Sequence, residues 1–83
     1  MSKKEHPQLQ ILFGENLQKI RNKKKLSLRA LASYCDLDDS NISKIENGKF
    51  NVQLSTIIEL AKGLSIDPKE LLDFDLSSIE QLK

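Results

Sequence analysis

Residue types that often stabilise a small domain are scarce in this chain of 83 residues. The sequence contains one cysteine, Cys35, one histidine and no tryptophan. A single cysteine excludes an intramolecular disulfide, and no cluster of cysteine and histidine is available to hold a structural zinc, so we expect no metal. We expect no cofactor either. A domain of this size buries only roughly 60% of its unfolded surface, which favours self-association as a further source of stability.

Long apolar runs are also absent, although 39% of the residues are hydrophobic. No run is long enough to cross a membrane, and the N-terminus is too polar for a secretory signal. We therefore expect a cytoplasmic protein with no membrane partner. Residues 1–7 are expected to form a disordered arm, residues 8–76 a single folded domain, and residues 77–83 a C-terminal tail.

Charge is distributed unevenly along the chain, although the formal net charge is only +1. Residues 1–35 contain eight basic and two acidic side chains, whereas residues 36–83 contain five basic and ten acidic ones. Such a split predicts one basic face on a domain whose other faces are acidic. This distribution is compatible with binding to DNA.

No segment alternates apolar and polar residues as a strand does, so we expect an all-α fold with five short helices. The first spans about residues 8–24, with an apolar stripe of Leu9, Phe13, Leu17 and Ile20. The second is capped by Ser27 and the third begins at Asp38 or Asp39. Gly48 is placed to end the third helix in a left-handed conformation.

Two further helices are predicted in the second half of the chain. The fourth runs from about residue 54 to a stop at Gly63, and its inward positions are Ile57, Ile58, Leu60 and Ala61. The fifth has Pro68 at its first helical position, where the missing N–H costs nothing.

The second and third predicted helices, joined by a short turn, have the form of a helix-turn-helix. Residues 27–32 read SLRALA and residues 37–48 read LDDSNISKIENG. These strings resemble the helix-turn-helix of the lambda-repressor-like regulators, the family of the xenobiotic-response-element and Cro/C1 type. Within that family, the short length and the segment NVQL at residues 51–54 look most like the controller proteins of restriction-modification systems.

The resemblance covers residues 12–74 and implies a five-helix, lambda-repressor-like domain that binds double-stranded DNA through its third helix. The side chains implied to read bases are Asp39, Ser40, Asn41, Ser43 and Lys44. Those implied to contact phosphates are Lys23, Lys24, Ser27, Asn47, Lys49 and Asn51. Several family members also pair the residues that match Arg21 and Glu46, which would fix the angle of the recognition helix.

Alternative interpretations exist for parts of this set. Asp38 and Asp39 fit a capping role better than base reading, and two acids facing DNA depart from the family's basic or amide residue at position 39. Leu28 stands where many members carry a phosphate-contacting glutamine. The lysines from 23 to 25 also suit the solvated end of a helix, whose dipole favours cations.

The C-terminal part of the chain carries more apolar residues than one short helix needs. We expect them to form a homodimer contact, with closure of the core as the alternative; they are Leu71, Leu72, Phe74, Ile79 and Leu82.

The function implied is a transcriptional regulator that acts as a homodimer on a pseudo-palindromic operator, as a restriction-modification controller does. An antitoxin that binds a toxin and regulates its own operon is the alternative. An enzyme is not expected, because the chain has no nucleophile and base set and no glycine loop for phosphate.

Overall fold

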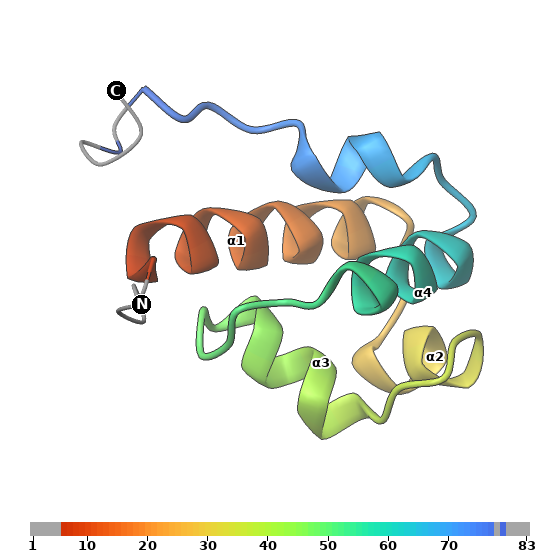
Figure 1. Cartoon of the computed structure of the whole chain (residues 1–83). Helices are drawn as coiled ribbons and strands as arrows, with labels where there is room; N and C mark the ends of the chain where they lie inside the picture. Colours follow the sequence, from red (N-terminus) through yellow and green to blue (C-terminus); the bar gives the residue numbers. More distant parts are fainter. Residues whose placement is uncertain (1–5, 78, 80–83) are drawn as a thin grey trace.

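The computed structural model describes residues 6–77 and residue 79, and within that part of the chain every regular element is helical (Figure 1). The elements are α1 (Pro7–Lys23), α2 (Leu28–Ser33), α3 (Asp39–Glu46), α4 (Leu54–Leu64) and the 3-10 helix η1 (Pro68–Leu72). The predicted all-α class is confirmed. The predicted arm lies mostly outside the described residues, and α1 already begins at Pro7, the last residue assigned to it.

The starts of α2 and α3 follow from local side-chain chemistry. The Ser27 Oγ accepts a hydrogen bond from the backbone N–H of Ala30 at 3.0 Å, and the Asp38 Oδ1 accepts one from the N–H of Asn41 at 3.0 Å. Each cap satisfies a backbone donor that has no partner within its helix. Gly48 follows α3 with a φ of 74°, the left-handed conformation expected for it.

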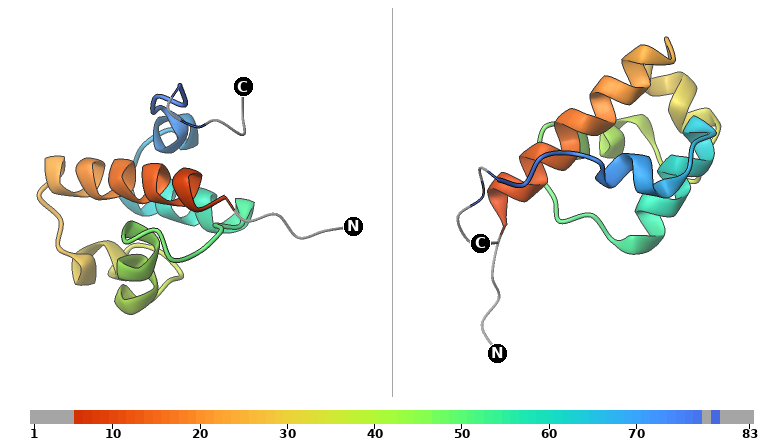
Figure 2. Two further views of the ribbon diagram at one scale, coloured as in Figure 1. Left: turned by 90° about the vertical axis from the view of Figure 1, so that its left-hand side faces the viewer. Right: turned by 90° about the horizontal axis from the view of Figure 1, so that it is seen from above.

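The helix α1 lies between η1 on one side and the helix-turn-helix of α2 and α3 on the other (Figures 1 and 2). One apolar core joins all five elements, and its fully buried large side chains are Leu17, Leu31, Ile42, Leu60, Leu64, Leu71 and Ile79. Within this core α3 packs chiefly on α1 and α2, so its angle is coupled to these two helices.

The structure corrects the prediction for α4 at two points. The helix does not stop at Gly63 but continues to Leu64, and Ser65 takes the left-handed position with a φ of 57°. A Cβ at Gly63 would lie 2.9 Å from the Leu31 Cδ1, so glycine serves close packing of α4 on α2 instead. Ile58, expected to face inward, is 46% exposed.

The fifth helix is a short 3-10 helix, capped by Asp67 and joined to α1 by Asn16. The Asn16 Nδ2 donates to the carbonyl oxygens of Glu70 and Leu71 at 2.9 and 3.0 Å. Leu71 and Ile79, both predicted for a dimer contact, are 0% and 1% exposed in the core of a single chain. In a single chain these two side chains therefore close the core, the alternative given for them, and Leu82 lies outside the described residues.

Candidate nucleic-acid interface

The side chains predicted to read bases all lie on α3, whose opposite side is buried. Ile42 and Ile45 pack into the core, and this leaves Asp39, Ser40 and Lys44 exposed. The spacing of four between Ser40 and Lys44 places both on one side of the helix, one turn apart. A surface of this form, polar and at the start of a helix, has the shape that enters a major groove.

Asn41 and Ser43 are half-buried and therefore less accessible than the three exposed side chains of α3. Asn41 helps to line a cavity of about 220 Å³ beside the segment that follows α3, together with Asn51 and Val52. The Ser43 carbonyl accepts a hydrogen bond from the Asn47 Nδ2 at 2.8 Å. Both residues therefore border the exposed set and do not form its centre.

The two aspartates at the start of α3 have different roles. The Asp38 carboxylate caps the helix through its Oδ1, and the same oxygen also accepts the Ser40 hydroxyl at 3.1 Å. Asp39 is exposed in the first turn, where its negative charge stabilises the positive end of the helix dipole. The Ser40 oxygen keeps lone pairs that can accept from a base.

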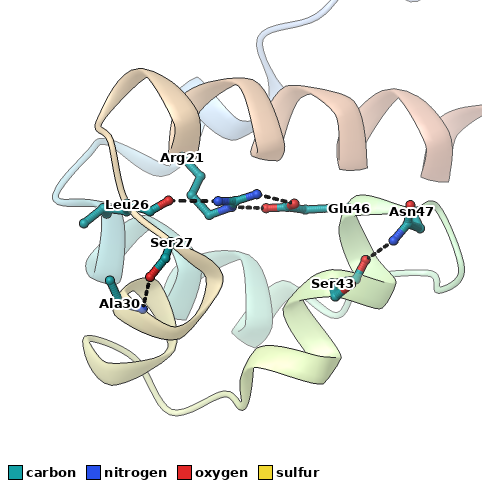
Figure 3. Close-up of polar contacts among 7 residues, drawn as sticks. All are labelled: Arg21, Leu26, Ser27, Ala30, Ser43, Glu46 and Asn47. Atoms are coloured by element: carbon teal, nitrogen blue, oxygen red, sulfur yellow. Dashed lines mark hydrogen bonds and ion pairs between the residues drawn. The ribbon is translucent and has the colours of Figure 1, made fainter.

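The predicted phosphate-contacting residues fall into two groups at opposite ends of the helix-turn-helix. Lys23, Lys24 and Ser27 lie at the turn between α1 and α2, and all three are exposed. The second group consists of the exposed residues Asn47, Lys49 and Asn51, after α3. Figure 3 shows Ser27 and Asn47, one residue from each group, with the Arg21 and Glu46 side chains between them.

Arg21 and Glu46 form a two-pronged ion pair that links α1 to the last turn of α3 (Figure 3). The Arg21 Nε donates to the Glu46 Oε2 at 2.6 Å, and the Nη2 donates to the Oε1 at 2.9 Å. The hydrogen bond to Glu46 raises the pKa of Arg21, and burial opposes this effect. The side chains are only 10% and 4% exposed, so removing either one leaves a buried charge without a partner.

A third Arg21 nitrogen extends this link to the turn before α2. The Nη1 donates to the Leu26 carbonyl at 2.8 Å, one residue before the Ser27 cap. One guanidinium therefore joins α1, the start of α2 and the end of α3. Sequence reasoning placed the pair but gave no sign of this backbone contact.

The described residues contain no group of three or more side chains suited to hold a metal ion. Cys35 is half-buried, and its Sγ donates to the Leu31 carbonyl at 3.4 Å. Burial raises the pKa of the Cys35 thiol, which disfavours the reactive thiolate. In the described part of the chain, no helix is both long and apolar enough to span a membrane.

The fold and the capped, exposed third helix define a helix-turn-helix protein, and comparison with known proteins agrees. Residues 17–71 match the family described as Helix-turn-helix, and the chain belongs to this family. The predicted resemblance is thereby confirmed, and the family consists of DNA-binding regulators and not of enzymes.

Within this family, the chain is similar to control proteins of restriction-modification systems. It is 42% identical over 77 residues to control protein C.BamHI of Bacillus amyloliquefaciens, a match that covers 90% of this chain and 95% of that protein. The restriction-modification controller protein C.AhdI of Aeromonas hydrophila has a crystal structure that is 40% identical. It aligns with a TM-score of 0.72 over 75% of this chain and 94% of that one.

A third relative has been solved in a DNA complex. The controller protein C.Esp1396I is 27% identical and aligns with a TM-score of 0.68 over 78% of this chain and 96% of that one. That structure is a tetramer in complex with its natural 35 base-pair operator. These relatives give no support to a toxin partner.

The structure also exposes apolar side chains that sequence reasoning did not assign to any site. Leu54 and Ile58, on the outer side of α4, are 74% and 46% exposed. Their spacing of four residues was a readable signal, because it places both on one side of a helix. The inward residues Leu60, Ala61 and Leu64 occupy the other side.

Proposed function

We propose that this protein is a sequence-specific, DNA-binding transcriptional regulator and the controller of a restriction-modification system. The observation that carries the proposal is the exposed polar side of α3, held at a fixed angle by the buried Arg21 and Glu46 pair. The similarity to C.BamHI over nearly the full length of both proteins supports the controller role. A regulator of this kind acts on DNA in the cytoplasm.

In this proposal Lys44 and Ser40 read base edges, with Asn41 and Ser43 beside them. The Lys44 ammonium can donate to the O6 or N7 of guanine, and Asp39 can accept from the N4 of cytosine. The exposed residues Lys23, Lys24 and Ser27 would contact the phosphates on one side of the groove. Asn47, Lys49 and Asn51 would contact the phosphates on the other side of the groove. Such phosphate contacts fix the position of the protein along the DNA and add no sequence information.

We propose that the protein binds its operator as a homodimer. One recognition helix covers few base pairs, and two copies related by a twofold axis read half-sites roughly 34–36 Å apart. Of the predicted contact residues, Leu72 is 53% exposed and Phe74 is half-buried. Both line a mainly apolar cavity of about 120 Å³ together with Phe50, and this lining supports contact with a second copy.

Selection from a random pool of duplex DNA tests the proposed function. We expect the wild-type chain to enrich a pseudo-palindrome, because a symmetric dimer presents two copies of α3. The matched control is the Lys44→Ala variant, which keeps the fold and should relax the preference at one base pair in each half-site. A pool that shows no enrichment with the wild-type chain would rule out sequence-specific binding.

Sedimentation at micromolar concentration tests the dimer and its surface. We expect Leu72→Glu to give monomers, because a charge in an apolar contact loses its hydration, and Ile58→Glu to leave the dimer intact. The opposite result would move the contact to the outer side of α4. A wild-type monomer that binds the selected operator tightly as a single copy would disprove dimeric binding.

A further inference from the structure

The middle of α1 meets α3 at a position without a side chain. Gly14 is buried, and a Cβ there would lie 2.6 Å from the carbonyl oxygen of Glu46 and would also collide with that of Ile45. Both oxygens belong to the backbone of the last turn of α3. No side-chain rotation can relieve such a collision, so the two helices could accommodate a methyl group only by moving apart.

Gly14 is the central point of a longer contact between α1 and the end of α3. The Gln10 Nε2 donates to the Gly48 carbonyl at 3.4 Å, and Arg21 holds the Glu46 carboxylate. Positions 10, 14 and 21 are separated by four and seven residues, which places them on one side of α1. Glu46 is thus held by its side chain at Arg21 and limited by its backbone at Gly14.

We propose that Gly14 is a positioning residue for the recognition helix: its missing side chain sets how closely α3 approaches α1. This inference rests on the proposed function, since the distance matters because α3 must present Ser40 and Lys44 to bases. Hydrogen bonds to base edges require donor–acceptor distances of about 2.7–3.2 Å, so a small displacement of the whole helix weakens them. Phosphate contacts by flexible lysines tolerate the same displacement.

A second buried glycine in the chain provides a matched control. Gly63 lies inside α4, and a Cβ there would meet the Leu31 Cδ1 at 2.9 Å and the Cys35 Cβ at 3.2 Å. These are side-chain atoms between α4 and α2, and the leucine terminus can rotate away. Replacing either glycine by alanine adds a methyl group to a buried contact of a helix, but only at position 14 is that contact made with backbone atoms. Only the change at position 14 acts on α3.

The test compares Gly14→Ala and Gly63→Ala in two measurements below their melting temperatures. Residual dipolar couplings of the free proteins report the angle of α3 relative to α1. Titrations with the selected operator and with a scrambled duplex report specific and non-specific binding. For Gly14→Ala we expect changed α3 couplings and a roughly tenfold loss of operator affinity, with binding to the scrambled duplex nearly unchanged. Gly63→Ala should match the wild type in both.

Three results would overturn the proposal. The first is a folded Gly14→Ala with wild-type couplings and wild-type operator affinity. The second is an equal loss on both DNAs, or an equal loss in Gly63→Ala, which would indicate a general effect on stability. The third is a Gly14→Ala chain that stays unfolded in trimethylamine N-oxide, which favours compact states, because the residue would then be needed for folding itself.

The dipolar couplings and the DNA titrations also distinguish a failure of this proposal from a failure of the proposed function. If the wild-type chain enriches no DNA sequence, the function fails, while the couplings still decide whether Gly14 sets the angle of α3.

Discussion

The helices α3 and α4 have similar roles in the core but are held in it by different forces. The 11-residue α4 buries Leu60, Ala61, Gly63 and Leu64, and no side chain caps its N-terminus. The 8-residue α3 buries only Ile42, Ile45 and Glu46, and it depends on the Asp38 cap and the ion pair to Arg21. Apolar burial has no preferred direction, whereas a cap and a two-pronged ion pair fix an angle.

This difference separates stability from orientation. The packing of α4 contributes free energy of folding, and the polar contacts of α3 determine where its exposed side points. We therefore expect substitutions in α4 to lower stability without changing DNA specificity, and substitutions at the ends of α3 to affect specificity more than their effect on stability suggests.

The largest effect is expected from Arg21→Leu. It leaves the Glu46 carboxylate buried without a partner and should lower the free energy of unfolding by about 3–5 kcal/mol. Thermal and urea unfolding measure this change. A melting curve equal to that of the wild type would contradict a structural role for the pair.

The double variant Arg21→Met with Glu46→Leu sharpens this result. An apolar pair of similar volume often restores or exceeds the original stability, because no charge is left buried. It lacks the directional bonds, so we expect near wild-type unfolding together with weaker binding to the selected operator. Wild-type operator affinity in this double variant would show that the ion pair does not orient α3.

Leu60→Ala is the corresponding test in α4. Leu60 is 0% exposed, and truncating a fully buried leucine costs about 2–5 kcal/mol through lost burial and the cavity left behind. We expect the ratio of operator to scrambled-duplex affinity to stay unchanged at temperatures where the variant is folded. A lower ratio would mean that α4 also sets the angle of α3.

Lys44→Ala and Lys49→Ala compare a proposed base contact with a proposed phosphate contact. Loss of the Lys44 ammonium should cost about 1–3 kcal/mol on the preferred site and little on other sequences. Lys49→Ala should weaken binding to all sequences alike. It should also reduce the salt dependence of the affinity by about the amount that one phosphate contact contributes. Titrations at several salt concentrations distinguish them, and an equal loss on both DNAs for Lys44→Ala would remove it as a base reader.

The smallest effect is expected at the cap of α3. Asp38→Ala removes the acceptor for the Asn41 N–H and should lower stability by about 1 kcal/mol, whereas Asp38→Asn keeps an acceptor and should cost less. Chemical unfolding of both variants measures the difference. Equal losses would show that the charge near the helix dipole matters more than the hydrogen bond.

The sequence predicted the parts of the fold that depend on neighbouring residues. The caps at Ser27 and Asp38, the left-handed Gly48 and the apolar stripe of α1 all follow from local spacing and chemistry. The order of the helices was also predictable, because Ser27, Asp38 and Pro68 mark the starts of three of them and apolar spacing marks the other two. The Arg21 and Glu46 pair came from the family resemblance, since no local rule joins residues 25 positions apart.

The remaining features depend on how distant segments meet. From the sequence alone, Gly63 is interpreted as a helix stop. In the structure Leu31 and Cys35 lie beside it, and glycine is needed there because a side chain would collide with them. Leu71 and Ile79 read as surplus apolar residues until the structure shows both buried in one chain, Leu71 where η1 packs on α1. Ile58 reads as buried from composition alone, because α4 is apolar on more than one side.

The three bonds of the Arg21 guanidinium also bear on the cost of binding. By joining the Leu26 carbonyl to the Glu46 carboxylate, they fix the separation of Ser27 and Asn47 before any DNA is present. A protein whose contact points already stand at their final spacing loses little conformational entropy on association. Recognition by this domain would then resemble the docking of a rigid body, with a rate set by encounter and not by rearrangement.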